Sequence, residues 1–258
     1  MHIAVCVKQI PDPAEPTQFD PETFRLDRTS AKIVLDESDA AGVEMALQLV
    51  EATGGDGTVT LISMAPDGEE AGIRTGLAMG ADQATVVSDP ALAGSDALAT
   101  SKVLGALVGS VSPDIVLTGT ESSDGYAGTV PEQIAAVRGL PSVTFAKSIA
   151  YEDGSVTVER QTASGFDRIS CPTPCVISLT AGVVEPRYPS FKGIRAAKSK
   201  PVTHFGLGDI GLNEAELGTR QSVRSITDAE NTKTGRTITD DGTAHDEILA
   251  FLEQANAL

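Results

Sequence analysis

Cysteine and histidine are both scarce in this chain of 258 residues, which has three of each. Cys6, Cys171 and Cys175 are too few, and odd in number, for a disulfide framework, and this favours a reducing compartment. Cys171 and Cys175 have a C-x-x-x-C spacing without a second Cys or His pair, so we expect no metal site. The histidines are scattered, and their spacing indicates no Ser/His/Asp or Cys/His catalytic arrangement.

Long apolar runs are also missing. No stretch of about 18 uncharged apolar residues occurs, so we expect no transmembrane helix. The first residues, 1–8, lack the basic region and the cleavage site of a signal peptide, which predicts a cytoplasmic protein. The hydrophobic content of 41% is nevertheless high enough for a substantial core.

Basic residues are outnumbered, because the formal net charge is -17. The acidic residues are spread along the chain, as on a solvated anionic surface. Nucleic acid is not expected as a partner, since phosphate binding needs a broad cationic face.

One stretch, Pro186 to Gly208, contains no acidic residue at all. Near its start, Pro186 and Pro189 remove backbone donors and take the chain out of regular structure, so the side chains there are presented on a loop. We expect residues 184–200 to form a docking loop for an acidic protein partner. The residues predicted to bind this partner are Arg187, Tyr188, Phe191 and Lys192, with Phe191 as the anchor.

The first half of the chain alternates short apolar runs with segments of helical period, which predicts a parallel sheet built from βαβ units. The expected strands are 3–7, 59–63, 84–87 and 115–118. The first helix is expected to have Asp39 as its N-cap, the second Asp67, and the third to begin near Ser95.

After about residue 140 the pattern changes. Strands are expected at 143–151, 156–161 and 175–180, and together they predict an antiparallel addition. We expect an α/β domain over 1–205 and a C-terminal arm over 206–258. The arm ends in a helix, 245–254, with one apolar stripe that a lone arm cannot bury, so this helix is expected to pack on another chain.

The loop from Gly119 to Glu132 is the best candidate for a binding site. It follows a strand, contains three glycines, and leads into a helix with Thr129 as the expected N-cap and Pro131 in the first turn. The free N–H groups of such a helix start can hold a phosphate. A glycine-rich loop that binds no ligand would have the same pattern.

Motifs of common nucleotide enzymes are missing from the first βα junction, residues 7–13. It has neither a G-x-G-x-x-G fingerprint nor a P-loop, which disfavours a hydride-transferring dehydrogenase and an NTPase. It also lacks the Ser-Gly-Gly-x-Asp-Ser-like loop of an ATP pyrophosphatase. No acid, base or nucleophile is evident, and an electron carrier needs none, because electron transfer requires proximity rather than proton transfer.

Several segments together resemble the electron transfer flavoprotein β subunit. They are Val7-Lys8, 73–82, 119–133, 140–145, 158–160, 174–178 and the Glu-Pro-Arg-aromatic segment 185–200. The resemblance implies an α/β domain with a parallel sheet, similar to adenine nucleotide α-hydrolases. It implies a heterodimer with an α subunit that holds most of an FAD, and AMP bound in this chain. Electrons would pass from acyl-CoA and related dehydrogenases to a membrane quinone reductase, the electron transfer flavoprotein-quinone oxidoreductase.

The resemblance also implies the residues of the nucleotide site. They are Cys6, Asp36, Glu37, Ser38, Asp39, Met64, Ser122, Ser123, Asp124, Gly125, Tyr126, Ala127, Gly128, Thr129, Val130, Pro131, Glu132 and Gln133. Asp36 stands where the family often has Asn, and a carboxylate accepts hydrogen bonds but cannot donate them.

Two alternatives remain open from the sequence. In one branch of the family a second FAD replaces AMP, and the protein bifurcates electrons taken from NADH. An adenine-nucleotide-binding sensor of the related fold is the alternative from another functional class, although the basic segment and the apolar arm helix would then have no clear purpose.

Overall fold

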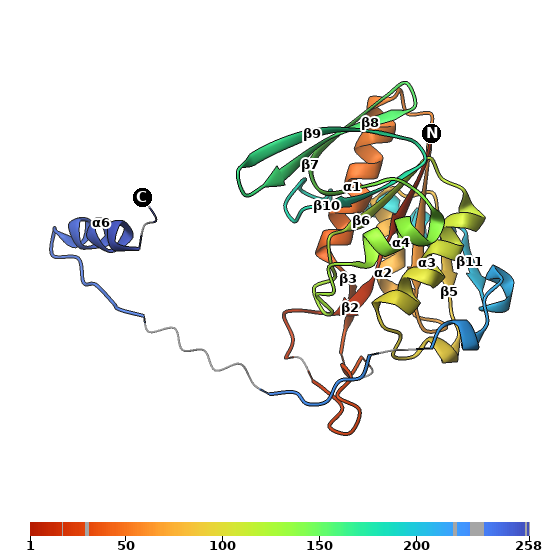
Figure 1. Ribbon diagram of the computed structural model, residues 1–258, viewed down its shortest axis with the longest axis horizontal. Coiled ribbons are helices and arrows are strands. Elements are labelled where there is room, and N and C mark those ends of the chain that lie inside the picture. The colour runs from red at the N-terminus through yellow and green to blue at the C-terminus, as the bar shows by residue number, and fades with distance from the viewer. Residues whose placement is uncertain (17, 29–30, 219–220, 228–234, 256, 258) are drawn as a thin grey trace. The chain divides into compact units, whose positions relative to one another are not determined.

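Two units make up the chain, Met1–Val223 and Arg224–Leu258, and each is described by itself. The computed structural model describes the chain except residues 17, 29–30, 219–220, 228–234, 256 and 258 (Figure 1). No helix in the described part of the chain is long and apolar enough to cross a membrane.

A nine-stranded sheet forms the centre of the first unit, in the order β11-β5-β4-β1-β6-β10-β7-β8-β9. Its parallel strands are β1 (His2–Cys6), β4 (Thr58–Met64), β5 (Gln83–Val87), β6 (Ile115–Gly119), β10 (Cys175–Leu179) and β11 (Val202–Phe205). Strand β7 (Ser142–Glu152) joins β10 in parallel, and β8 (Ser155–Thr162) and β9 (Gly165–Pro172) continue the sheet in antiparallel order. A separate small sheet pairs β2 (Gln9–Pro11) with β3 (Ile33–Leu35).

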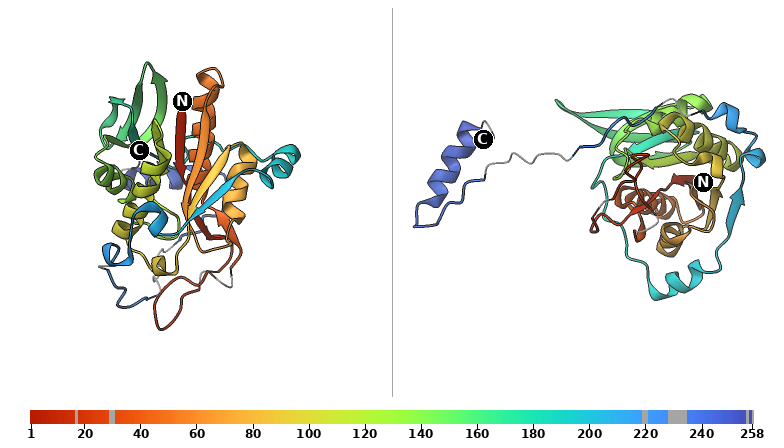
Figure 2. Two further views of the ribbon diagram at one scale, coloured as in Figure 1. Left: turned by 90° about the vertical axis from the view of Figure 1, so that its right-hand side faces the viewer. Right: turned by 90° about the horizontal axis from the view of Figure 1, so that it is seen from below.

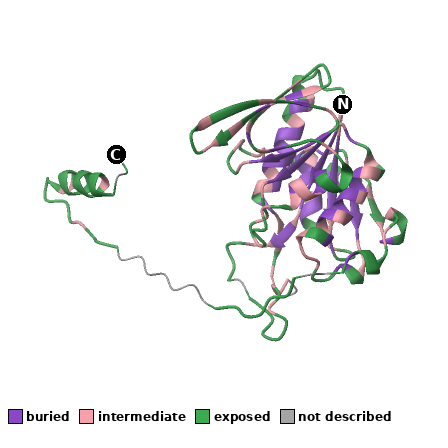
Figure 3. Cartoon of the chain, in the orientation of Figure 1, coloured by how far each residue is buried: buried purple, intermediate pink, exposed green. Residues whose placement is uncertain are grey.

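Helices cover both faces of this sheet (Figure 2). They are α1 (Glu37–Ala52), α2 (Ala71–Met79), α3 (Ala97–Val111), α4 (Val130–Arg138) and α5 (Phe191–Ala197), with short 3-10 turns at Pro90–Leu92, Gly208–Ile210 and Glu214–Glu216. One core cluster joins β1 and β4 to α1 and α2, and a second joins the other face of the same strands to α3 and α4. Burial is therefore highest along the parallel strands, as Figure 3 shows.

The predicted fold class is confirmed: a mostly parallel sheet with an antiparallel addition. One strand was assigned to the wrong part. The sequence placed residues 175–180 in the antiparallel addition, but β10 runs parallel to β6 and β7. Its five residues are all buried, as expected for a strand inside a parallel sheet, and so they show no alternation that would set the direction.

Two predicted helix caps are also wrong. Helix α1 is capped by Asp36, whose side chain accepts from the Ser38 backbone, and the expected cap Asp39 lies inside the first turn. Helix α2 follows Glu70 rather than Asp67, and no side-chain hydrogen bond caps it. Because α1 begins earlier than expected, Asp39 lies buried within the helix and does not cap it.

The domain boundary lies further along than the sequence indicated. Residues 206–217 belong to the first unit, because Leu207 and Leu217 are buried against the α3 side of the core. The second unit contains the expected closing helix, α6 (Ala244–Gln254), on which Ile248, Leu249 and Phe251 are exposed.

Candidate functional site

The carboxyl ends of β1, β4 and β6 lie at one edge of the sheet, because the three strands are parallel neighbours. This edge is where open α/β sheets bind ligands. Cys6 ends β1, Met64 ends β4, and Gly119 ends β6 and opens the predicted loop. The structure therefore brings three separate parts of the predicted site together.

Asp36 joins the predicted loop to helix α1. Its fully buried carboxylate accepts hydrogen bonds from the Ser38 backbone at 3.0 Å and from the Ser38 hydroxyl at 2.7 Å. It also accepts from the Ser123 backbone at 2.7 Å and from the Ser123 hydroxyl at 3.0 Å. Because four donors meet it, Asp36 needs no donor from a ligand, and its main role is to hold residues 122–124 over the start of α1.

Asp39, in the first turn of α1, connects the residues at the ends of β1 and β6 through hydrogen bonds. Its carboxylate accepts from the Lys8 backbone N–H at 2.6 Å, and it also accepts from the backbone of Gly119. Burial, and then the charge of Asp36, raise the pKa of Asp39 to about 8, although these hydrogen bonds favour the charged form. Asp39 therefore binds a proton more readily than an ordinary aspartate does.

An ion-pair cluster of Lys8, Arg28 and Asp124, which we call the loop clamp, also holds the loop that follows β6. The Lys8 ammonium lies 2.6 Å from Asp124 Oδ1 and 3.1 Å from the Ser122 hydroxyl. The Arg28 guanidinium pairs with Asp124 Oδ2 and donates to the Gln9 carbonyl oxygen at 3.0 Å. Burial opposes ionisation of Asp124, but Lys8 and Arg28 hold its pKa below the usual value.

Sequence reasoning found Asp124 but missed the two cations as site residues. Lys8 directly follows the first strand region, and that position was a usable signal. Arg28 comes from a segment without regular periodicity, and only the fold brings it to Asp124, 96 positions away in the chain.

The end of the loop leads into α4 as predicted. Tyr126 and Gly128 have positive φ angles of 44° and 62°, which make a tight turn. Thr129 occupies the N-cap position, but its side chain caps no backbone N–H; its hydroxyl accepts from the Gln133 amide at 3.3 Å instead. Among the described residues no side chain caps the first turn of α4, in which Pro131 has no N–H to donate, while Ser101 holds Gln133 through a 3.0 Å hydrogen bond.

The remaining predicted site residues line the same edge with less specific roles. Burial, and then Asp39, raise the pKa of the Cys6 thiol to about 12, so it is a packing group and no nucleophile. One carboxylate oxygen of Glu132, in the first turn of α4, is buried and has no hydrogen-bond partner in the described part of the chain. Val130 packs against the α3 core cluster, whereas Glu37 and Ala127 are exposed.

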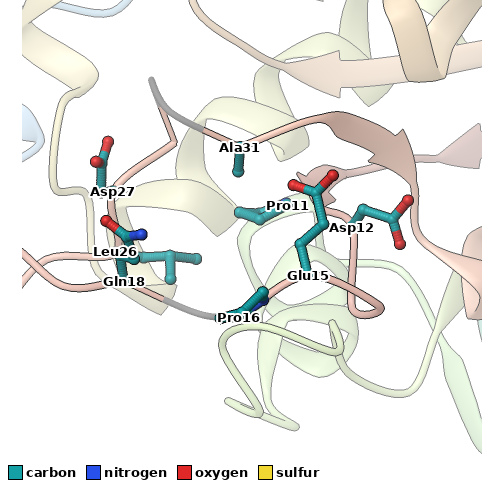
Figure 4. A pocket seen from close by; sticks show the side chains of 8 residues that line it. All are labelled: Pro11, Asp12, Glu15, Pro16, Gln18, Leu26, Asp27 and Ala31. Atoms are coloured by element: carbon teal, nitrogen blue, oxygen red, sulfur yellow. The ribbon is translucent and has the colours of Figure 1, made fainter.

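A pocket of about 140 Å³ lies in the neighbouring segment 11–31, outside the predicted site. Figure 4 shows its lining residues, Pro11, Asp12, Glu15, Pro16, Gln18, Leu26, Asp27 and Ala31. The negative charge of its acidic side chains is partly neutralised, because Lys32 pairs with Asp12 at 2.9 Å. The described residues contain no cluster of His, Cys, Asp and Glu that could hold a metal ion.

The predicted docking loop is a short helix on a fixed base. Helix α5 begins at Phe191, and the Ser190 hydroxyl caps it by accepting from the Gly193 backbone at 3.0 Å. The Lys200 ammonium donates to the Leu77 and Ala81 carbonyl oxygens at the end of α2, at 3.0 and 2.6 Å. The expectation of an unstructured loop is thus wrong over residues 191–197, because a serine cap and the packing on α2 allow a helix.

Arg187 belongs to the base of this segment. Its guanidinium pairs with Glu44 at 2.6 Å and with Glu51 at 2.8 Å, both on α1. Burial opposes ionisation of Glu44, but hydrogen bonds from Arg187 and Gln48 hold its pKa below the usual value. Arg187 is therefore engaged within its own chain, although sequence reasoning assigned it to a partner.

The aromatic residues of the segment face solvent. Tyr188 is 92% exposed and Phe191 is 91% exposed, which is unusual for large apolar side chains. A shallow hollow beside them is lined by Phe191, Lys192, Arg195 and Ala196. Exposed aromatic side chains with basic neighbours, on a segment anchored through Arg187 and Lys200, are typical of a protein-binding surface.

Comparisons with known proteins agree with this geometry. The family model of the electron transfer flavoprotein domain matches residues 23–209. Electron transfer flavoprotein subunit beta of Mycobacterium bovis is 37% identical over 258 residues, which cover 97% of each chain. The corresponding subunit of Megasphaera elsdenii is 36% identical, over 88% of this chain and 86% of its own. This chain belongs to the electron transfer flavoprotein family, as a subunit beta.

Membership confirms the resemblance inferred from the sequence and fixes the general role. An electron transfer flavoprotein β subunit takes part in electron transfer, and its name implies an α partner. A further relative, the caffeyl-CoA reductase-Etf complex subunit CarD of Acetobacterium woodii, is 36% identical over 88% of this chain and 86% of its own. The family thus includes subunits of reductase complexes.

The edge described above offers groups of the kind that can bind a nucleotide. The first turn of α4 offers backbone N–H groups for a phosphate, and Gly125 leaves room beside Ser122 and Lys8 that a Cβ atom would narrow to 3.1 and 3.5 Å. Asp39 and Glu132 provide carboxyl oxygens that can accept hydrogen bonds from amino and hydroxyl groups. The residues present therefore fit a mononucleotide.

Proposed function

We propose that this chain forms a heterodimer with an electron transfer flavoprotein α subunit. The pair carries electrons from acyl-CoA and related dehydrogenases to a membrane quinone reductase. FAD is held mainly by the α subunit, and it supplies the redox chemistry. This chain is a carrier subunit and not an enzyme. The observation that carries the proposal is the pair of exposed aromatics, Tyr188 and Phe191, on a base fixed by Arg187 and Lys200.

We propose AMP as the nucleotide of this chain. Its phosphate lies at the first turn of α4, and its nucleoside lies between that helix and the start of α1, near Asp39. Two features support this placement. The helix start has unused donors, and the buried anions Asp36 and Asp124 are already balanced by donors of the chain itself. This edge is therefore expected to accommodate best a ligand with a single phosphate group.

Phe191 is proposed as the anchor that a dehydrogenase receives. Truncation of a buried aromatic anchor typically costs about 2 kcal/mol or more, which corresponds to roughly thirtyfold in affinity. We expect Phe191→Ala to slow electron transfer from an acyl-CoA dehydrogenase by about tenfold or more at low carrier concentration. The measurement is the rate of flavin reduction in the purified heterodimer.

The control for this test is Val137→Ala, which shortens another exposed apolar side chain, on α4. Both variants should fold and retain their FAD, since neither residue is part of the core. Unchanged transfer rates in Phe191→Ala, measured below saturation, would exclude Phe191 as the anchor.

A second candidate is a bifurcating flavoprotein, in which this chain holds FAD instead of AMP and takes electrons from NADH. The relative named as a subunit of a caffeyl-CoA reductase-Etf complex favours keeping this candidate. The two candidates differ in the number of flavins per heterodimer, which can be counted directly. An adenine-nucleotide sensor without an α subunit would leave the exposed aromatics without a purpose.

The C-terminal arm is proposed to bind the α subunit. In the second unit, α6 exposes Ile248, Leu249 and Phe251, and an isolated helix of 11 residues gains little stability in water by itself. A partner surface that covers these side chains would stabilise the helix.

A further inference from the structure

Arg74 of α2 connects this helix to the end of α5, the helix of the predicted docking loop. Its Nη1 atom donates to the Ala197 carbonyl oxygen at 2.7 Å and to the Lys200 carbonyl oxygen at 3.0 Å. Ala197 is the last residue of α5 and is buried. The last carbonyl groups of a helix have no partner inside the helix, so Arg74 supplies donors that the end of α5 lacks.

The contact between the two helices is reciprocal. The Lys200 ammonium, just after α5, donates to the Gly80 and Ala81 carbonyl oxygens behind α2, at 3.2 and 2.6 Å. The helices also touch directly, because a Cβ atom on Gly193 would lie 2.3 Å from the Ala78 carbonyl oxygen. Helix α5 projects from the first unit in both views of Figure 2, where it is drawn in cyan. Its contact with α2 therefore determines where it lies.

Arg74 is itself held in place from its other side. Its Nε atom donates to Glu70 Oε2 at 2.8 Å, one helical turn earlier in the chain. The second carboxylate oxygen of Glu70 lies 2.8 Å from His204 Nε2, on β11. Burial opposes ionisation of Glu70, but hydrogen bonds with His204 and Arg74 hold its pKa below the usual value. The guanidinium is thus oriented by the chain before any partner arrives.

The two exposed aromatic residues are fixed by different helices. Tyr188 follows Arg187, which pairs with Glu44 on α1. Phe191 begins α5, a helix of seven residues that is too short to be stable by itself. Because Phe191 is 91% exposed, it contributes little packing of its own, and the contacts with α2 must hold the helix that carries it.

We infer that Arg74 is a positioning residue that holds Phe191 in the orientation in which a dehydrogenase receives it. This inference rests on the proposed function, in which Phe191 is the anchor. An anchor that is ordered before docking loses less conformational entropy on binding. Without Arg74, the end of α5 loses two hydrogen bonds, and the helix has to be ordered when the dehydrogenase binds. Arg74 therefore acts through Phe191 and needs no contact of its own with the partner.

Steady-state kinetics of an acyl-CoA dehydrogenase, with the purified heterodimer as electron acceptor, test the inference. Arg74→Gln should raise the KM for the heterodimer by about tenfold and leave kcat within about twofold, because positioning affects docking and not transfer in the docked complex. The control Arg138→Gln removes an exposed arginine from α4 and should leave both quantities unchanged. A wild-type KM in Arg74→Gln would overturn the inference.

A double-variant cycle separates positioning from a direct contact of Arg74 with the dehydrogenase. In a chain that already carries Phe191→Ala, Arg74→Gln should raise KM by less than about twofold, because no anchor is left to position. The same fold-change in KM in both backgrounds would overturn the inference alone. Wild-type kinetics in Phe191→Ala would contradict the anchor of the proposed function as well.

Amide hydrogen exchange gives a readout that does not depend on a dehydrogenase. In the heterodimer with Arg74→Gln, the amides of 194–197 should exchange about tenfold faster than in the wild type, while those of β1 and β4 stay unchanged. Unchanged exchange over 194–197 would overturn the inference. If Arg74→Gln does not fold, Glu70→Gln replaces it, since this variant keeps the guanidinium and removes only its charged partner. It should raise KM in the same direction by a smaller factor, and a wild-type KM would again overturn the inference.

Discussion

Asp124→Asn is the sharpest perturbation of the proposed nucleotide site, because it removes the charge that two cations share. The Asp124 side chain is only 8% exposed, whereas those of Lys8 and Arg28 are 41% and 31% exposed. Hydrogen bonds to charged groups contribute about 1.5–3 kcal/mol each. Partial exposure of the cations reduces that value, and asparagine keeps one acceptor oxygen. A net loss of about 1.5–2 kcal/mol is therefore expected from the loop clamp.

Two measurements detect this loss. The free energy of unfolding in urea should fall by about that amount. The release of AMP from the proposed site should accelerate by about tenfold or more, since 1.4 kcal/mol corresponds to a factor of ten and the clamp holds a loop of that site. Displacement of AMP by a fluorescent analogue gives the release rate. High salt should change little, because the Asp124 carboxylate is buried.

Controls separate the loop clamp from a general charge effect. Asp56→Asn removes an equal charge from an exposed position and should leave both quantities unchanged. Arg28→Gln should accelerate release on its own, but combined with Asp124→Asn it should add less than the sum, because the two residues share one interaction. Wild-type stability and AMP release in Asp124→Asn would refute the reasoning.

Three further predictions concern other parts of the chain. Because the pKa of Asp39 in the folded protein is raised to about 8, the wild type loses stability as the pH rises from about 4 to 8. In urea unfolding over that range, the free energy of unfolding of Asp39→Asn should fall by a few kcal/mol less than that of the wild type. The control Glu159→Gln, at an exposed position, should follow the wild type. Gly193→Ala places a Cβ 2.3 Å from the Ala78 carbonyl oxygen and should lower stability by about 1–3 kcal/mol, unlike Gly208→Ala, which meets nothing within 4 Å. Truncation before Asp240 removes α6 and should weaken the heterodimer in size-exclusion chromatography; an equally stable complex would contradict a role for α6 in binding the α subunit.

The sequence predicted the parallel core well, because its strands are short apolar runs that parallel packing buries on both sides. The expected strands 3–7, 59–63, 84–87 and 115–118 match β1, β4, β5 and β6 within one or two residues. Strand β9 escaped prediction, since its sequence Gly165–Pro172 mixes exposed polar, charged and aromatic residues without a clean alternation. An edge strand outside the core carries little hydrophobic signal.

The candidate site was predictable in location but not in its connections. The position of 119–133 after a strand and before a helix indicated the loop, and that order survives in the structure. The partners Lys8 and Arg28 depend on side chains that meet only after folding. Likewise, Arg187 looked available for a partner because its acceptors, Glu44 and Glu51, lie far away in the sequence.

The central claim is that this chain holds AMP beside an α subunit that holds FAD. The direct test is to purify the heterodimer, denature it, and count the FAD and AMP released per heterodimer. The account predicts one FAD and one AMP. Two FAD and no AMP would contradict it and would favour the bifurcating flavoprotein, with NADH as the next ligand to test.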